Sequence, residues 1–169
     1  MLGKDQLLGL VEEGFRKPAW HGPNLQSALR GVSAEEAVWR PAEGRHNIWE
    51  IALHAAYWKY AVTRRLTGNK KHEFPEKGRN WFERDGAKLA HDEAAKRWKG
   101  DLAFLARTHG ELRNAIAVIK EKDLTRSTRG NRQTVMRNIV GIAMHDVYHA
   151  GQIQLLRKLY RDRMKLESK

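Results

Sequence analysis

Apolar residues recur every three or four positions along most of the chain, which is the spacing of one face of an α-helix. No stretch shows the alternation of apolar and polar residues that indicates a half-buried strand. The pattern predicts helices over residues 4–17, 24–31, 47–68, 91–120 and 133–161, with a short helical turn from Ser33 that ends before Pro41.

Capping residues mark several of these boundaries. Ser33 is followed by Glu36, and Asn47 is followed by Glu50, which is the spacing of an N-cap and its N3 partner. Gly68 is a typical residue just beyond a helix C-terminus. Because four helices are long, we predict an all-α fold, a four-helix bundle, that forms a single domain over residues 1–169.

The apolar face of the last predicted helix contains polar residues at its centre. In steps of three and four residues this face runs through Val135, Asn138, Ile142, His145, His149, Gln152, Leu156 and Leu159. On the helix over 47–68, His54 takes a similar place between Ile51 and Trp58. Three histidines are therefore expected on faces that should be buried.

Burying these imidazoles without partners would cost on the order of several kcal/mol. A divalent metal ion would satisfy them, because neutral histidine nitrogens bind zinc at roughly 2.0–2.1 Å. Two histidines one helical turn apart and a third on a facing helix leave one position open, which is typical of a catalytic metal site. The alternative is that each is a core histidine hydrogen-bonded to a neighbour.

Three residues near these histidines each have two interpretations. Gln152 either contacts a metal-bound water or substrate, as a tentative catalytic residue, or hydrogen-bonds a neighbouring backbone or imidazole group. For Asp146 we expect a surface ion pair with a nearby arginine rather than a contact that orients a metal ligand. Trp58 either forms a wall of the pocket or packs in the core.

The remaining aromatic residues carry weaker signals. The other histidines share no helix face and are expected to be exposed or to cap helices: His21, His46, His72, His91 and His109. Core or interface positions are expected for Trp20, Trp39, Trp49 and Trp98. We expect the Trp81-Phe82 pair to hold the long connection to the bundle; the alternative is a lid over the site.

Composition narrows the chemistry. The chain has no cysteine, which excludes disulfides, thiolate ligands and a cysteine nucleophile. Its net charge is +12, but the basic residues are scattered, so we expect a solvated surface rather than a nucleic-acid partner. The alternative is nucleic-acid binding through the basic surface, with an affinity that falls steeply as salt rises. No stretch approaches the roughly 20 apolar residues of a membrane span, and no signal-peptide pattern is present, so we expect a cytoplasmic protein.

The stretches HNIWEIALHAAYW and HDVYHAGQIQLLRK, in this order, resemble the DinB-like superfamily, which includes YfiT-type metal-dependent hydrolases and bacillithiol transferases. The resemblance implies an up-down-down-up bundle in which residues 69–90 form the crossover between the second and third helices. It also implies a metal triad of His54, His145 and His149, with zinc or nickel as the metal, and a homodimer.

We therefore predict a metal-dependent enzyme that transfers a low-molecular-weight thiol to a small electrophilic substrate. One alternative is a hydrolase of YfiT type, which would use the same site to activate water. Another is a non-catalytic dimeric binding module with a structural metal. A fourth metal ligand from Gln152 or Glu83 would favour that module.

Overall fold

The structure is a computed structural model that describes residues 2–69, 73–85, 89–128 and 132–168. Within these ranges it contains helices and no β-strand, which confirms the all-α class. The helices are α1 (Lys4–Phe15), α2 (Leu25–Leu29), α3 (Ala34–Val38), α4 (Ile48–Thr67), α5 (His91–Ala117) and α6 (Val135–Glu167), with a 3-10 turn at Glu121–Asp123. No helix of the described chain is long and apolar enough to cross a membrane.

The predicted caps form. The Asn47 side chain accepts a hydrogen bond from the backbone N–H of Glu50 at 2.9 Å, and Ser33 accepts one from Glu36 at 3.1 Å. At the end of α4, Gly68 adopts a left-handed conformation with φ 70°, and its N–H donates to the Arg64 carbonyl. Other boundaries differ from prediction: α1 ends at 15 rather than 17, α2 covers 25–29 rather than 24–31, α5 ends at 117 rather than 120, and α6 covers 135–167 rather than 133–161.

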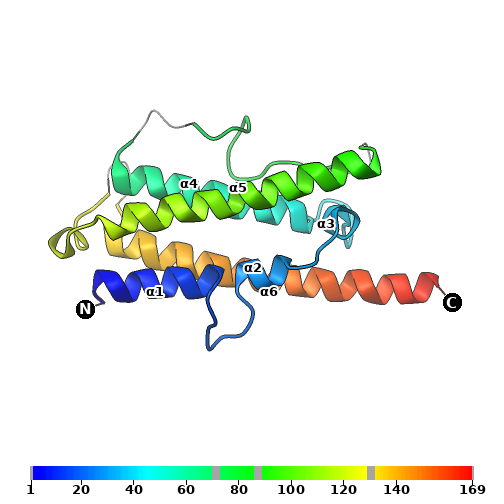
Figure 1. Cartoon of the computed structure of the whole chain (residues 1–169), viewed down its shortest axis with the longest axis horizontal. Coiled ribbons are helices and arrows are strands. Elements are labelled where there is room, and N and C mark those ends of the chain that lie inside the picture. Colours follow the sequence, from blue (N-terminus) through cyan, green and yellow to red (C-terminus); the bar gives the residue numbers. More distant parts are fainter. Residues whose placement is uncertain (1, 70–72, 86–88, 129–131, 169) are drawn as a thin grey trace.

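The four long helices lie side by side (Figure 1). α4 packs against α5 and α6, and α1 packs against α6 and α5. In Figure 1, α1 and α6 run in one direction along the long axis, and α4 and α5 run in the opposite direction. The short helices α2 and α3 cover α6 and α4 respectively.

Two apolar clusters fill the interior. One includes Leu25, Trp49, Leu53, Trp98 and Ile153. The other includes Leu7, Val11, Leu112, Ile139 and Ile142. Each fully buried aliphatic side chain contributes about 1.5–3 kcal/mol. Along α6, residues 144–149 lie between the members of the two clusters, so the predicted histidines lie where the two clusters meet.

The tryptophans differ in their burial. Trp49 and Trp98 are buried as expected, and their ring N–H groups donate to Asp101 and to the Val32 carbonyl. Trp39 is half-buried. Trp20 is fully exposed, contrary to expectation, because it lies in the turn between α1 and α2 rather than on a helix face. His72 lies outside the described residues.

Candidate metal centre

Helices α4 and α6 bring the three predicted histidines together. The Nε2 atom of His145 lies 3.0 Å from Nε2 of His54 and 3.1 Å from Nε2 of His149. One ligand atom from each ring lies within 4.8 Å of the others, and the cluster could hold a metal ion. His54 and His149 are buried, and His145 is partly exposed. We call these three residues the histidine triad.

The outer nitrogens of two triad rings are held by oxygen acceptors. Nδ1 of His54 lies 2.7 Å from the backbone oxygen of Asn80, and Nδ1 of His149 lies 2.6 Å from Oε1 of Gln152. Because carbonyl oxygens only accept hydrogen bonds, both Nδ1 atoms carry the proton. In a neutral imidazole the opposite nitrogen is then unprotonated, so both Nε2 atoms present a lone pair to the centre of the triad.

Burial keeps the triad uncharged. Loss of hydration lowers the pKa of His54 to about 4 and that of His145 to about 3, and the neighbouring imidazoles lower both further. Burial also lowers the pKa of His149, although its hydrogen bond to Gln152 acts in the opposite direction. At neutral pH the rings are therefore in the form that binds metal.

The donor set fits a divalent metal. Two lone pairs face Nε2 of His145, which carries at most one hydrogen and cannot satisfy both. Nδ1 of His145 is buried and has no hydrogen-bond partner in the described chain, so this ring lacks the acceptor that orients the other two. A cation at the point where the three Nε2 atoms converge would use all the lone pairs. Three imidazole nitrogens suit a divalent transition metal, and no carboxylate of the described residues joins the cluster.

The connection between α4 and α5 supports the triad through contacts that the sequence analysis did not predict in detail. Trp81 is stacked between His46 and His54, with ring centroids 3.6 and 3.8 Å apart. The Asn80 side chain accepts a hydrogen bond from the ring N–H of Trp58 at 2.8 Å. Trp58 therefore both packs and lines the site. Trp81 covers His54. For Trp81, this contact is closer to the alternative interpretation, a lid over the site, than to the expected role of holding the connection to the bundle.

Phe82 holds the connection to the bundle, as expected for the pair. It is buried and contacts Tyr57 and Phe74, with ring centroids 5.6 and 4.9 Å away. The two neighbouring aromatic residues thus have different roles: Trp81 covers the triad, and Phe82 fills the core.

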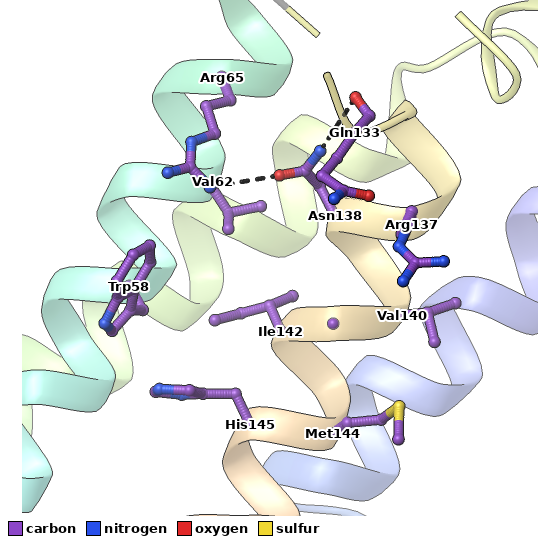
Figure 2. Close-up of a pocket in the computed structure, with 11 residues that line it drawn as sticks. Trp58, Val62, Arg65, Gln133, Arg137, Asn138, Val140, Ile142, Met144 and His145 are labelled. Atoms are coloured by element: carbon purple, nitrogen blue, oxygen red, sulfur yellow. Dashed lines mark hydrogen bonds between the residues drawn. The ribbon is translucent and has the colours of Figure 1, made fainter. Parts of the chain in front are cut away.

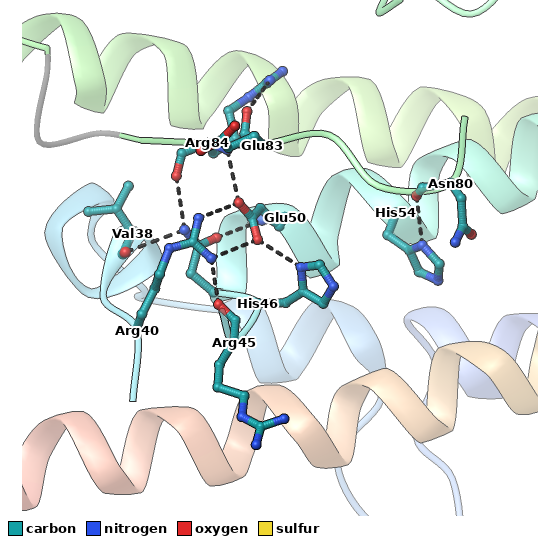
Figure 3. A network of polar contacts seen from close by, with 10 residues as sticks. Val38, Arg40, Arg45, His46, Glu50, His54, Asn80, Glu83 and Arg84 are labelled. Carbon is teal, nitrogen blue, oxygen red and sulfur yellow. Dashed lines mark hydrogen bonds and ion pairs between the residues drawn. The ribbon is translucent and has the colours of Figure 1, made fainter. Parts of the chain in front are cut away.

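A polar network around Glu50 holds His46 (Figure 3), which stacks on Trp81. The buried Glu50 carboxylate accepts two hydrogen bonds from Arg40, one from the Arg84 backbone N–H and one from Nδ1 of His46. Burial raises the pKa of Glu50, but these hydrogen bonds outweigh it and leave the pKa below its usual value. Glu50 therefore holds His46, which stacks on Trp81, which in turn stacks on His54.

Pockets border the triad on two sides. One of about 540 Å³ is lined by residues that include Trp81, His149 and Gln152. Another of about 450 Å³ is lined by residues that include Trp58 and His145 (Figure 2). The triad can therefore be approached from two directions.

Residues 19–153 match the family model of the DinB superfamily. The chain belongs to the DinB superfamily. No curated protein matches it. Among solved structures it is similar to the colibactin self-resistance protein ClbS, in a crystal structure of a complex with double-stranded DNA. That match has a TM-score of 0.60 and 18% identity, and it covers 92% of this chain and 96% of the other.

The ClbS complex corrects one expectation about this DinB-superfamily protein. We expected no nucleic-acid partner because the basic residues are scattered and form no recognisable motif. That exclusion is wrong, because a protein of this fold has been crystallised with double-stranded DNA. Scattered basic residues in a sequence do not show how charge is distributed over a folded surface.

Asp146 lies elsewhere than predicted. Instead of pairing with a surface arginine, it is fully buried and forms an ion pair with Lys59, which is also fully buried. Its partner comes from α4, so neither residue's local sequence indicated the pair. The Asp146 side chain makes no hydrogen bond to the triad among the described contacts.

His109 is also buried, contrary to expectation. Its Nε2 lies 3.2 Å from the Glu12 carboxylate, and its ring stacks on Phe15 at 3.9 Å. A sequence signal for this burial exists: Leu105, His109, Leu112 and Ile116 follow the spacing of one helix face. His46 is exposed as expected, but it contributes to the site through Trp81.

Proposed function

We propose that this chain is a metal-dependent enzyme that transfers a low-molecular-weight thiol to a small electrophilic substrate. The observation that carries the proposal is the convergence of the three Nε2 atoms of the triad. In two of the rings, the opposite nitrogen, Nδ1, is held by the Asn80 carbonyl or by Gln152. Oriented, neutral imidazoles are the usual ligands of catalytic zinc sites.

The proposal includes the topology. We propose one domain, an up-down-down-up four-helix bundle, in which residues 69–90 cross from α4 to α5. The helix directions in Figure 1 and the contacts of α4 with both α5 and α6 support it. Facing helices of such bundles commonly supply the ligands of a metal in the core.

The residues of the chain have distinct roles. His54, His145 and His149 would hold zinc or nickel, whose positive charge lowers the pKa of a thiol in the remaining position. The Asn80 carbonyl and Gln152 orient two of the rings. Gln152 also donates to the Tyr148 hydroxyl at 3.0 Å, so both ends of its amide are engaged, and we propose a positioning role for it.

One feature favours thiol transfer over hydrolysis. The chain has no cysteine, which is compatible with both reactions, since the nucleophile would be an external thiol or a water molecule. Pockets border both His149 and His145, which provides space for two reactants, a thiol and an electrophile. A hydrolase would need space for only one organic substrate.

Two observations disfavour a saturated, purely structural metal. Gln152 directs its amide oxygen to Nδ1 of His149, on the far side of the ring from the metal-facing Nε2. Glu83 is exposed and is not part of the histidine cluster. Neither residue is placed as a fourth ligand.

The experiment begins with the metal. Protein purified without an affinity tag should hold about one zinc or nickel ion per chain by elemental analysis. A His54/His145/His149→Ala variant should hold none, and a His109→Asn variant, which changes a buried histidine outside the triad, should keep it. Absence of metal from the unaltered protein, even after zinc or nickel is supplied, would refute the proposal.

The reaction is tested on the loaded protein. With cysteine, glutathione or coenzyme A as the thiol and 1-chloro-2,4-dinitrobenzene as the electrophile, a C–S bond forms, the C–Cl bond breaks, and chloride and the thiol proton are released to solvent. The loaded protein should accelerate this substitution with at least one thiol, and the triple variant should not. Metal-dependent ester hydrolysis without thiol transfer would instead establish the hydrolase alternative.

DNA binding is a second candidate function. The net charge of +12 and the likeness to a protein crystallised with double-stranded DNA support it. Binding through phosphates releases counterions, so affinity for a short duplex should fall steeply as salt rises. Affinity that is absent at low salt, or that salt does not change, would dispose of this candidate.

A further inference from the structure

The pocket beside His145 has apolar walls and two cationic side chains. Its walls include Trp58 and Val62 from α4 and Ile142 from α6 (Figure 2). Arg65 reaches it from α4 and Arg137 from α6. No acidic residue is among the described residues that line it. We call it the Arg65–Arg137 pocket.

The positive charges of this pocket are not neutralised within the described chain. Arg40 and Arg157 each form an ion pair with a carboxylate. Neither Arg65 nor Arg137 has such a partner within residues 2–69, 73–85, 89–128 and 132–168. Two unneutralised guanidinium groups beside an apolar cavity attract an anion, and guanidinium groups bind carboxylates and phosphates with paired hydrogen bonds.

Arg65 is held in place at the pocket. Its guanidinium lies over the Trp58 ring, 5.4 Å from the centroid, and Nη1 donates a long hydrogen bond of 3.4 Å to Asn138. In Figure 2 the Asn138 side chain lies between Arg65 and Arg137. A side chain already positioned by stacking loses less conformational entropy when it binds an anion.

Trp58 connects this cationic end to the triad. Its ring centroid lies 6.2 Å from that of His145 and 6.3 Å from that of His54. The same ring carries Arg65 on its face. A molecule lying along Trp58 can therefore meet a guanidinium at one end and the histidine triad at the other.

We propose that the Arg65–Arg137 pocket binds a small amphipathic anion, with its carboxylate, sulfonate or phosphate on Arg65, in the positive field of Arg137, and its apolar body against Trp58, Val62 and Ile142. The far end of the molecule then lies at His145. Calling this anion a substrate rests on the proposed function, because the reaction would take place at the triad. Its binding depends only on the pocket.

The probe is 2-naphthoate, with the uncharged 2-naphthamide as its matched control, titrated into the metal-loaded protein and followed by calorimetry. The unaltered protein should bind naphthoate about tenfold more tightly than naphthamide, equivalent to about 1.4 kcal/mol. An Arg65→Gln/Arg137→Gln variant should lose this preference. Arg137→Gln alone, which changes an exposed residue and leaves the Arg65–Trp58 stack intact, should reduce it.

An Arg45→Gln variant is the matched control for charge, because Arg45 lines the pocket on the His149 side. It should bind naphthoate as the unaltered protein does. Equal affinity for naphthoate and naphthamide in the unaltered protein would overturn the proposal. So would loss of naphthoate binding in the Arg45 variant but not in the Arg65/Arg137 variants.

Measurements on two variants distinguish anion binding in this pocket from metal binding at the triad and from DNA binding. The triple histidine variant should still bind naphthoate. The anion-binding proposal can therefore hold even if the triad binds no metal. The Arg65/Arg137 variant should keep its metal, which also shows that it folds. If it instead loses affinity for a short DNA duplex while naphthoate binding is unchanged, the arginines contact DNA and the small-anion proposal is wrong.

Discussion

His109 and His149 are buried almost equally, at 1% and 3% exposure, but their Nε2 atoms meet different partners. Nε2 of His109 faces the Glu12 carboxylate, whereas Nε2 of His149 faces Nε2 of His145. A carboxylate satisfies an imidazole N–H within the protein. Three converging imidazole nitrogens without an acid can hold a cation. The partner, rather than the burial, therefore distinguishes a candidate metal ligand from a structural histidine.

The surroundings of His109 extend this comparison. Phe15 stacks on His109, and the Lys59 ammonium lies 4.8 Å from the Phe15 ring centroid. Lys59 pairs with Asp146, so this buried ion-pair region, formed by Glu12, Lys59, His109 and Asp146, contains charges of both signs. The triad holds three neutral bases and no acid. The ion-pair region carries its own counter-charges, whereas the triad could hold a positive ion.

The largest expected effect comes from breaking the Lys59–Asp146 pair. Burial lowers the pKa of Lys59 and raises that of Asp146, and each residue's charge opposes this effect on the other. Asp146→Asn leaves a buried ammonium unpaired, so the free energy of unfolding should fall by about 3–5 kcal/mol in urea titrations. The zinc content of the folded variant should be unchanged.

A double variant controls for this result. Lys59→Met/Asp146→Leu removes both charges and should recover most of the lost stability. If Asp146→Asn is as stable as the unaltered protein but loses its zinc, Asp146 supports the triad, and the separation of the two regions is wrong.

The pH dependence of the metal-free protein gives a graded effect. The unfolded chain binds protons on its histidines near pH 6.5, but the folded pKa values are about 4 for His54 and about 3 for His145 and His109. The unfolded state therefore takes up protons first as pH falls. The free energy of unfolding, measured in urea with a chelator present, should decline from about pH 6.5 toward pH 4.

Zinc should separate the two regions in the same experiment. His145→Asn and His109→Asn should each flatten the decline of the metal-free protein. With zinc bound, the decline should become steeper because protons also displace the ion, and only His145→Asn should abolish this added slope. A stability that stays constant between pH 7 and pH 4 would contradict the buried, neutral state of these histidines.

A smaller effect is expected at Gln152. Gln152→Leu removes the acceptor of the His149 Nδ1–H and should weaken zinc binding by about 10–100-fold in titrations against a competing chelator. Tyr148→Phe removes only the hydroxyl that Gln152 contacts, so its effect should be smaller. An equal loss in both variants would show that Tyr148, rather than the amide oxygen, positions the ring.

Local sequence patterns predicted the helices and the triad because both depend on short-range spacing. Asn47 and Gly68 mark the ends of α4, and the 3.6-residue period of α6 placed His145 and His149 on a face shared with Ile142. The facing position of His54 followed from the same period on α4. These inferences needed no knowledge of which loop lies near which helix.

The supporting contacts could not be predicted because they join segments far apart in the chain. The Asn80 carbonyl holds His54 from within residues 73–85, which form no helix or strand, and Asn80 has φ 72°. Lys59 lies on an alanine-rich face of α4, which gives no sign of an acidic partner on α6. His109, in contrast, was predictable, because its period with Leu105 and Leu112 places it in the core.

The most direct test of the comparison is NMR of the histidine ring nitrogens during a zinc titration. Without metal, His54 and His149 should carry their proton on Nδ1. As zinc is added up to about one equivalent, the Nε2 signals of His54, His145 and His149 should move together, and those of His109 should stay. Signals of His109 that move with the triad, or triad signals that do not respond to zinc or nickel, would contradict the account.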